Sequence, residues 1–350
     1  MPRLSFTLAV FTAGICFASA AAGASLGITQ IAAAPDAEGP ITVFYRAADD
    51  APTRPGPLGA TLAYDAPPLA DGNRRLIVIS HGSGGTPWVH TKLARRLIDA
   101  GFVVAMPRHE GDHHGDMRDA GPVTWSRRPA EVSRAIDAVG RDARFAPLLD
   151  LDRVGMYGQS AGGHTALSLA GGVWSASRFV AHCEAHVGED FHACASVVTR
   201  LTGGWADGFK QWLARTVIRL RFGGDDPPHA YRDPRIAAVV AGNPYAADFD
   251  MSTLERPAVP LGLVTTGQDR WLVPRFHGLR VAQACASCER IAHLESAGHG
   301  ALLSPPVPAE ELQGTLGHLL ADPPGFDRER ELPAVDEAMA GFFQRHLVRR

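Results

Sequence analysis

Hydrophobic residues are concentrated in short continuous runs, and amphipathic segments lie between these runs. Six runs have the length and unbroken apolar character of strands buried on both faces, at residues 76–80, 102–106, 154–157, 236–241, 261–265 and 291–294. Apolar residues recur at helical spacing in segments 90–100, 129–139 and 161–170, and again near residues 335–347. This alternation predicts an α/β fold with a mostly parallel central sheet flanked by helices.

Two shorter segments, residues 41–45 and 60–64, precede the first buried run and have the composition of strands. Proline and glycine residues divide the two segments, as in a turn. We expect the two segments to pair with each other as a hairpin ahead of the main sheet.

One segment interrupts the alternation, because about sixty residues separate the helix after Ser160 from the strand at Ile236, far more than in an ordinary connection. Large apolar residues recur in this segment at helical spacing, and they are Trp205, Phe209, Trp212, Leu213, Val217 and Leu220. A helix with such a stripe is expected to pack on another part of the protein. We interpret residues 173–233 as a helical cap insertion that covers the functional site; additional core on the flank of the sheet is the alternative.

The first 24 residues have the pattern of a secretory signal peptide. Arg3 gives a positive start, residues 4–17 are uncharged and largely apolar, and small residues at 18–20 or 22–24 offer a cleavage site. The apolar run is too short to span a bilayer comfortably, although an uncleaved membrane anchor is the competing interpretation. We expect a signal peptide at residues 1–24, a domain at 25–350, and a periplasmic or secreted protein without stable membrane insertion after cleavage.

Length and charge limit the classes of function. A chain of 350 residues accommodates one large domain or two. The formal net charge is −3 and no dense run of lysine and arginine occurs, so the sequence lacks the electrostatic pattern of proteins that bind nucleic acid or acidic membrane surfaces. A small or neutral molecule is therefore the expected partner.

Four cysteines remain if Cys16 is removed with the signal peptide. An even number in an oxidising compartment predicts disulfides, and proximity in the sequence favours Cys183 with Cys194 and Cys285 with Cys288, although four cysteines allow three pairings. The spacing of Cys285 and Cys288 also suits a zinc site, but no second pair with matching spacing accompanies it.

The sequence Gly158-Gln159-Ser160-Ala161-Gly162 lies between a predicted strand and a predicted helix. In a G-x-S-x-G turn of this kind the serine is strained and exposed at the end of the strand, and the flanking glycines avoid a clash. We therefore predict that Ser160 is a nucleophile. A tight turn without chemical function is the alternative, because so short a pattern also occurs by chance.

A serine hydroxyl needs a base, and the base needs an acid that orients it. His299 follows the last predicted strand in a glycine-containing loop, and Asp269 follows the strand before it, which gives the chain order serine, acid, histidine. We predict a triad of Ser160, Asp269 and His299. Asp248 and Asp250 follow an earlier strand and are rivals for the role of the acid, and a surface loop is the alternative place for His299.

Two backbone N–H groups are needed to stabilise the oxyanion of a tetrahedral intermediate. Ala161 follows the nucleophile at a helix N-terminus, and Ser83 lies in the glycine-rich loop after the first buried run, where the backbone can approach closely. We predict that Ser83 and Ala161 form the oxyanion hole. A phosphate-binding loop is the alternative, but the full nucleotide-binding patterns are missing from the sequence.

Histidine and carboxylate side chains are dense in residues 109–116, the loop after the second buried run. Such a cluster can hold a transition metal, but its order matches no helical two-histidine motif. We interpret the loop as a pocket wall or a loop surface, and we predict no metal ion and no cofactor in the site. We expect His164, on the helix after Ser160, to pack against neighbouring elements.

These motifs resemble those of bacterial predicted dienelactone hydrolases, relatives of the platelet-activating-factor acetylhydrolase branch of the α/β hydrolases. The resemblance covers residues 76–305 and rests on Ile79-Ser-His-Gly-Ser-Gly-Gly85, Tyr157-Gly-Gln-Ser-Ala-Gly-Gly163, Gly242-Asn-Pro244 and Ala297-Gly-His299. It implies hydrolysis of carboxylic esters on an α/β-hydrolase fold without a cofactor. Two features depart from it. Dienelactone hydrolases carry a cysteine where this chain has Ser160, and the acetylhydrolase branch has its acid where this chain has Asn243.

The expected chemistry is acyl transfer, in which His299 deprotonates Ser160, an acyl-enzyme forms, and water activated by the same histidine releases the acid. Compact or short-chain esters are the expected substrates. A serine peptidase or amidase shares every predicted catalytic residue and is the nearest alternative. A binding protein on a catalytically decayed scaffold is another, because a fold alone does not establish function.

Overall fold

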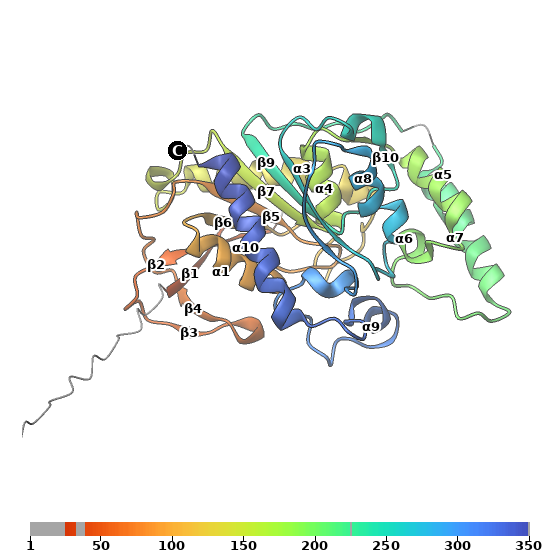
Figure 1. Cartoon of the computed structure of the whole chain (residues 1–350), viewed down its shortest axis with the longest axis horizontal. Coiled ribbons are helices and arrows are strands. Elements are labelled where there is room, and N and C mark those ends of the chain that lie inside the picture. Colours follow the sequence, from red (N-terminus) through yellow and green to blue (C-terminus); the bar gives the residue numbers. More distant parts are fainter. Residues whose placement is uncertain (1–24, 33–38, 225, 349–350) are drawn as a thin grey trace, which may run out of the picture.

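A ten-stranded sheet runs through the computed structural model of the chain, which describes residues 25–32, 39–224 and 226–348 (Figure 1). In spatial order the strands are β12 (Glu289–Leu294), β11 (Leu261–Thr266), β9 (Ile236–Gly242), β7 (Val154–Gln159), β5 (Leu76–Ser80), β6 (Val103–Pro107), β2 (Ile41–Ala47), β1 (Ser25–Ile31), β4 (Thr61–Tyr64) and β3 (Arg54–Pro55). Neighbouring strands from β12 to β6 are parallel, whereas β2 is antiparallel to both β6 and β1. The predicted α/β class with a mostly parallel sheet is confirmed.

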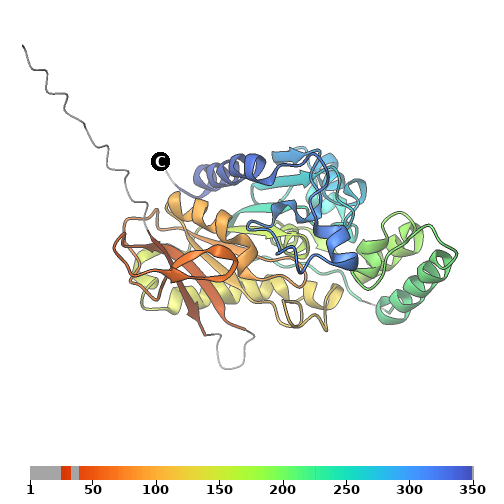
Figure 2. The same ribbon diagram turned by 90° about the horizontal axis from the view of Figure 1, so that it is seen from below.

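Helices cover both faces of this sheet (Figure 2). Outside the segment 173–233 they are α1 (Thr91–Asp99), α2 (Pro122–Trp125), α3 (Arg128–Arg141), α4 (Ala161–Leu169), α8 (Gly278–Ala284), α9 (Gly314–Leu320) and α10 (Arg328–Leu347). The last helix begins before the predicted residue 335, because the side chain of Asp327 caps its first turn by accepting a hydrogen bond from the N–H of Arg330.

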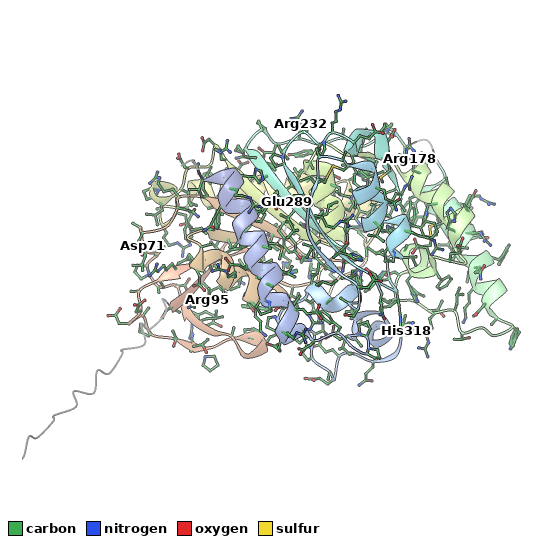
Figure 3. The ribbon with its side chains drawn as sticks, in the orientation of Figure 1. Asp71, Arg95, Arg178, Arg232, Glu289 and His318 are labelled. Atoms are coloured by element: carbon green, nitrogen blue, oxygen red, sulfur yellow. A yellow bond between two sulfur atoms is a disulfide. The ribbon has the colours of Figure 1, made fainter. Side chains whose placement is uncertain are left out.

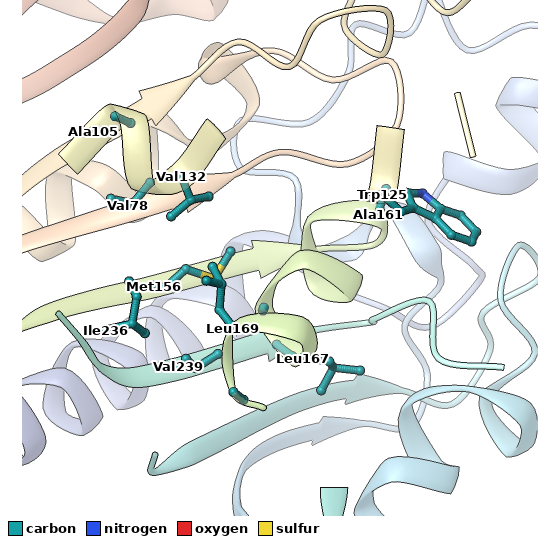
Figure 4. Packing of buried hydrophobic residues seen from close by; sticks show 14 of the residues in the cluster. Val78, Ala105, Trp125, Val132, Met156, Ala161, Leu167, Leu169, Ile236 and Val239 are labelled. Carbon is teal, nitrogen blue, oxygen red and sulfur yellow. The ribbon is translucent and has the colours of Figure 1, made fainter. Parts of the chain in front are cut away.

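The two faces of the sheet have separate hydrophobic cores, because successive side chains of a strand point in opposite directions. In β5, Leu76 and Val78 pack with α3 and α4, and the intervening Ile77 and Ile79 pack with α1 and α10. Figure 4 shows Val78 of the first core with Val132 of α3 nearby. A strand buried in this way is a continuous apolar run in the sequence, which is why the central strands were predictable.

The predicted hairpin of residues 41–45 and 60–64 is wrong. These residues form β2 and β4, but β1 lies between them, antiparallel to β2 and parallel to β4. Strand β1 pairs with β2 along seven residues, from Ser25 opposite Ala47 to Ile31 opposite Ile41. Strand β1, which directly follows the predicted signal peptide, was not predicted from the sequence. The signal-peptide prediction itself lies outside the described residues.

The segment between α4 and β9 contains β8 (Val173–Trp174), α5 (Ala176–His186), α6 (Phe191–Ala195) and α7 (Asp207–Phe222). Strand β8 pairs with β10 (Phe249–Asp250) in a separate two-stranded sheet. Helices α5 and α7 lie at the end of the molecule farthest from β3 and β4 in both ribbon views (Figures 1 and 2). The segment therefore extends beyond the end of the sheet.

The expected packing of the apolar stripe of α7 is wrong, because the stripe faces solvent: Trp205 is 97% exposed and Leu220 is 82% exposed. The helix packs on α5 through its other side, where Ile218 is buried. The spacing of apolar residues correctly predicts a helix here, but it does not reveal which side of a helix is covered.

Both predicted disulfides are present, Cys183 with Cys194 and Cys285 with Cys288. The first links α5 to α6, and the second closes a short turn between α8 and β12. The alternative of a zinc site at Cys285 and Cys288 is therefore wrong, because the two sulfurs are bonded to each other. None of the helices among the described residues combines the length and the apolar character needed to cross a bilayer.

Candidate active site

Ser160 occupies a sharp turn between the end of β7 and the start of α4. Its backbone angles, φ 59° and ψ −117°, lie in a region that a non-glycine residue rarely adopts. The glycines on either side allow this turn to form. A Cβ atom added to Gly158 would lie 1.9 Å from the carbonyl oxygen of Gly162, and one added to Gly162 would lie 1.8 Å from the carbonyl oxygen of Ser80. The turn predicted from the five-residue motif is therefore the one observed.

A chain of hydrogen bonds connects Ser160 to His299 and Asp269. The distance from Ser160 Oγ to His299 Nε2 is 2.9 Å, and the distance from His299 Nδ1 to Asp269 Oδ2 is 2.7 Å. Because the Asp269 carboxylate can only accept, Nδ1 carries the imidazole proton and Nε2 is free to accept from the serine hydroxyl. This is the tautomer that a general base next to a serine requires.

The loop after β11 holds the carboxylate of Asp269 in place. Its second oxygen, Oδ1, accepts hydrogen bonds from the backbone N–H groups of Trp271 and Leu272, each at 2.8 Å. The indole ring of Trp271 lies against the imidazole of His299, with 5.0 Å between ring centroids. Both Asp269 and His299 are buried, so their orientations are fixed by packing as well as by hydrogen bonds.

The two rival carboxylates contact other partners. Asp248 is fully buried and accepts a hydrogen bond from Nε2 of His164 at 3.0 Å, so His164 packs within the protein as expected. Asp250 accepts hydrogen bonds from Ser252 and forms an ion pair with Arg178, which Figure 3 labels on α5. Among these acids, Asp269 is the one that the structure brings to His299.

The glycine-rich loop after β5 lies directly against Ser160. A Cβ atom added to Gly82 would lie 3.3 Å from Cβ of Ser160, and Ser83 lines the same cavity as Ser160. Ala161 is the first residue of α4, so its N–H belongs to the first turn, where backbone donors have no partner within the helix. The donor roles of Ser83 and Ala161 remain predictions; Ser83 lines the cavity that contains Ser160, and Ala161 is the next residue after Ser160.

A buried carboxylate fixes this loop from behind. Oδ1 of Asp112 accepts hydrogen bonds from the hydroxyl of Ser83 at 2.6 Å and from the N–H of Gly84 at 3.0 Å. The guanidinium of Arg128 donates to Oδ2 of Asp112 at 2.7 Å and to the carbonyl oxygen of His81 at 2.6 Å. Burial raises the pKa of Asp112, but the charge of Arg128 and these hydrogen bonds outweigh burial and hold the pKa below its ordinary value.

His109 belongs to a second hydrogen-bonded chain behind the site. Its Nε2 lies 2.7 Å from Ser80 Oγ, and its Nδ1 is hydrogen-bonded to Glu131. The order of groups repeats that of Ser160, His299 and the acid, but Ser80 is completely buried and no substrate can reach it. Burial holds the pKa of His109 well below its ordinary value, so the ring is neutral.

The predicted role of residues 109–116 as pocket wall or loop surface is therefore incomplete. His114 lines the cavity, whereas His109 and Asp112 point inward and support the neighbouring loop. Sequence reasoning missed their partners Arg128 and Glu131 on α3. Both residues lie on the buried side of α3, among its apolar residues. Charged residues on the apolar face of a predicted helix were therefore the signal that could have identified these buried partners.

A buried cluster that no sequence motif predicted is formed by His182, Asp190 and His277. Their potential metal-ligand atoms all lie within 4.8 Å of one another. Asp190 Oδ2 accepts from Nε2 of both histidines at 2.8 Å. The backbone N–H of Ala246 donates to Nδ1 of His277 at 3.0 Å, which leaves the ring proton on Nε2. That nitrogen then has no lone pair for a metal, so the cluster is a hydrogen-bonded brace between the 173–233 segment and the loop that follows Asp269.

A cavity of about 650 Å³ opens at Ser160, and both Ser160 and His299 belong to its lining. This volume lies within the range typical of small-molecule sites. The surrounding wall is largely apolar and comes from several elements; it includes Leu58, Trp88, Val197, Trp271, Leu316 and Leu320. Of these residues only Val197 belongs to the segment 173–233, so most of the wall comes from outside the predicted cap.

Comparison with known proteins does not assign the chain to a family. No family model matches the sequence, and no curated protein matches it. The geometry of the site is therefore the basis for assigning a function.

Proposed function

We propose that this chain is a serine hydrolase of the α/β-hydrolase fold that cleaves carboxylic esters through an acyl-enzyme intermediate. The observation that carries the proposal is the continuous chain from Ser160 Oγ through the imidazole of His299 to Asp269, at 2.9 and 2.7 Å. The strained turn at Ser160 and the order of the three residues along the sequence support the same fold assignment.

In the proposed reaction, Nε2 of His299 accepts the proton of the Ser160 hydroxyl as Oγ attacks the ester carbonyl carbon. Asp269 stabilises the resulting imidazolium. The backbone N–H groups of Ala161 and Ser83 donate to the oxyanion of the tetrahedral intermediate. The imidazolium then protonates the leaving alcohol, and an acyl-enzyme on Ser160 remains. Water, deprotonated by His299, attacks the acyl carbon and releases the carboxylic acid and the free serine.

The lining of the cavity favours an ester with a compact acyl group, rather than a peptide, as the substrate. Its wall is largely apolar and bounded on several sides, so it suits the burial of an uncharged group rather than an extended chain with many backbone hydrogen bonds. A panel of esters of graded acyl length, each with its amide counterpart, tests this choice. Faster cleavage of the amides would identify a peptidase or amidase instead.

Labelling with a fluorophosphonate probe tests the proposed nucleophile. We expect the purified protein to be labelled and Ser160→Ala to remain unlabelled, because the probe reacts with an activated serine hydroxyl. Ser168→Ala is the matched control, since Ser168 lies on α4 and donates to the carbonyl oxygen of His164 away from the cavity. A parent protein that resists the probe while remaining folded would identify a binding protein on a decayed scaffold.

We also propose that the protein acts in the periplasm or after secretion. Two disulfides among the described residues support this location, because disulfides persist mainly in oxidising compartments. N-terminal sequencing of the protein from a periplasmic fraction should find a chain that begins near residue 25. Recovery of the full-length chain from the cytoplasm would contradict the proposal.

A further inference from the structure

Helix α7 presents an apolar stripe to solvent. Five large side chains of α7 and Trp205, which lies just before the helix, are between 44% and 97% exposed; the five are Phe209, Trp212, Leu213, Val217 and Leu220. Water-exposed apolar surface costs free energy, and a contiguous patch of this kind marks a surface that binds a partner. The helix lies at one end of the molecule (Figures 1 and 2), and the stripe is exposed there.

The opposite side of α7 is attached to α5. Ile218 is buried, and the rings of Phe222 and Phe179 meet edge to face with 5.6 Å between centroids. Nε of Arg219 donates to Oε1 of Glu184 at 2.8 Å. Rotation of the helix to bury its stripe would break all of these contacts, so the stripe stays on the outside.

Helix α5 is itself fixed to the protein. The disulfide between Cys183 and Cys194 ties it to α6. Asp190, just beyond α5, accepts hydrogen bonds from His277 at 2.8 Å and from the N–H of Val273 at 3.0 Å. The stripe is therefore carried on a rigid support.

Basic residues flank the stripe. Residues 196–222 contain five basic residues and one acidic residue, although the whole chain has a net charge of −3. Lys210 pairs with Asp207, and Arg219 pairs with Glu184. No ion pair joins Arg200, Arg215 or Arg221 to an acidic group within the described part of the chain. An exposed apolar stripe with basic flanks is typical of helices that lie in the interface of an anionic bilayer.

We propose that α7 docks on the surface of an anionic lipid membrane, with the apolar stripe among the acyl chains and the arginines at the head groups. Tryptophan suits this position, because its ring is apolar and its N–H finds a partner among the head groups. A second copy of the chain fits less well, since pairing two stripes would bring together two sets of arginines that have no acidic partner among the described residues. The net charge of the whole chain did not reveal this surface, because the excess of basic residues is confined to one segment.

One loop lies between the cavity and the stripe in the sequence. Val197 lines the cavity, and the loop that contains it leads to Trp205 at the start of the stripe. Val198, the next residue, is 85% exposed. The loop that carries Val197 therefore connects the wall of the cavity to the stripe in the sequence. The proposal itself is independent of the hydrolase chemistry, because it rests on the surface of α7 alone.

Sedimentation with vesicles tests the proposal on the purified protein. One set of vesicles is phosphatidylcholine alone, and the other contains about one third phosphatidylglycerol. We expect the anionic vesicles to bind the protein about tenfold more tightly, and high salt to weaken that binding, because arginines near an anionic surface are attracted electrostatically. Tryptophan emission should shift to shorter wavelength on binding, as Trp205 and Trp212 leave water. Equal affinity for both vesicles, or no binding to either, would overturn the proposal.

Surface variants locate the binding. Phe209→Ser with Trp212→Ser should weaken binding about tenfold or more, because two apolar side chains no longer enter the bilayer. Arg215→Gln with Arg221→Gln should remove most of the preference for anionic vesicles. Val123→Ser is the matched control, since Val123 on α2 is also exposed and apolar but lies outside the stripe.

Analytical ultracentrifugation without lipid tests whether a second copy of the chain, instead of a membrane, covers the stripe. The proposal requires the same sedimentation for the parent and for the Phe209 and Trp212 variant. A dimer that dissociates in this variant would identify the stripe as an interface between copies of the chain, and would overturn the proposal. Circular dichroism melts of all variants confirm that each is folded.

Discussion

Asp112 and Arg128 form an ion pair 2.7 Å long in which neither side chain is exposed to solvent. One oxygen of the carboxylate faces the guanidinium, and the other accepts hydrogen bonds from Ser83 and Gly84 of the loop against Ser160. The ion pair therefore joins α3 to the proposed oxyanion hole. The contribution of the ion pair to stability and its effect on the position of the loop that contains Ser83 can be measured separately.

Asp112→Asn should destabilise the fold strongly. The asparagine can still accept from Ser83, but Arg128 remains buried without its counter-ion, and breaking a buried pair in this way costs about 3–5 kcal/mol. Urea unfolding measures this loss. Asp119→Asn is the matched control, because Asp119 pairs with Arg127 in a partly exposed position and such pairs contribute about 1 kcal/mol or less. Equal losses in the two variants would contradict the structural role of Asp112.

Ser83→Ala should affect catalysis more than stability. The change removes one hydrogen bond to Asp112, worth about 1 kcal/mol, and leaves the ion pair with Arg128 intact. Because the loop then holds its backbone N–H less firmly, we expect kcat to fall about tenfold with little change in KM, the pattern of an interaction made in the transition state. Steady-state kinetics on a short-chain ester measure both constants. A change in KM alone would show that Ser83 contacts the substrate in its ground state.

Asp269→Asn should lower kcat by a factor of about 10⁴, because an amide at this position favours the wrong tautomer of the histidine. Asp250→Asn is the matched control, since Asp250 pairs with Arg178 and caps a short turn instead of contacting His299. We expect its activity to stay close to that of the parent. If Asp250→Asn is the more damaging change, the assignment of the acid is wrong.

The candidate triad was predictable because each of its members lies at or shortly after the carboxyl end of a strand. Runs of buried residues locate the strands, and parallel strands bring their carboxyl ends to one edge of the sheet. Ser160, Asp269 and His299 were therefore expected at the same edge although they are distant in sequence. The short motif at Ser160 added the local geometry of the turn, since its glycines are required by steric contacts.

Contacts between elements were not predictable in the same way. The sequence shows that α7 has an apolar stripe, but the exposure of Trp205 depends on where α5 lies. Arg128 and Asp112 belong to different elements, and no local pattern relates them. Likewise β1 separates β2 from β4 because it pairs with both, whereas the turn residues between the two predicted strands suggested a hairpin. Periodicity identifies an element, and tertiary packing decides its neighbours.

Gly162→Ala should prevent correct folding of the site, whereas Gly208→Ala should be tolerated. A Cβ atom at residue 162 would lie 1.8 Å from the carbonyl oxygen of Ser80, so β5 and α4 would have to move apart, at a cost of about 3 kcal/mol or more. At Gly208, in the first turn of α7, an added Cβ would meet no atom within 4 Å beyond its chain neighbours and the backbone of the same helix, so alanine should cause no loss of stability. Thermal unfolding and fluorophosphonate labelling of both variants test the contrast. A stable, labelled Gly162→Ala protein would contradict the tight packing of the turn.

His90 makes stability depend on pH. Its ring is completely buried, and neither nitrogen has a hydrogen-bond partner among the described residues. Burial lowers the pKa of His90 to about 4, whereas the ordinary value, which applies to the unfolded chain, is about 6.5. Between these two values the unfolded chain binds a proton that the folded protein excludes, so stability falls as the pH is lowered through this window. The contribution of His90 amounts to about 3 kcal/mol between neutral pH and pH 4.

His90→Leu should remove this part of the acid sensitivity, because leucine does not titrate. Urea unfolding of the parent and the variant at about pH 7.5 and about pH 4.5 gives two differences in free energy, and we expect the variant to gain about 2–3 kcal/mol relative to the parent on acidification. Any cost of repacking leucine is present at both pH values and cancels in this comparison. The acid sensitivity of other buried histidines, such as His81 and His109, is shared by both proteins and also cancels. The difference in the free energy of unfolding between parent and variant could instead be the same at both pH values. That result would mean that His90 has the same pKa in the folded protein as in the unfolded chain.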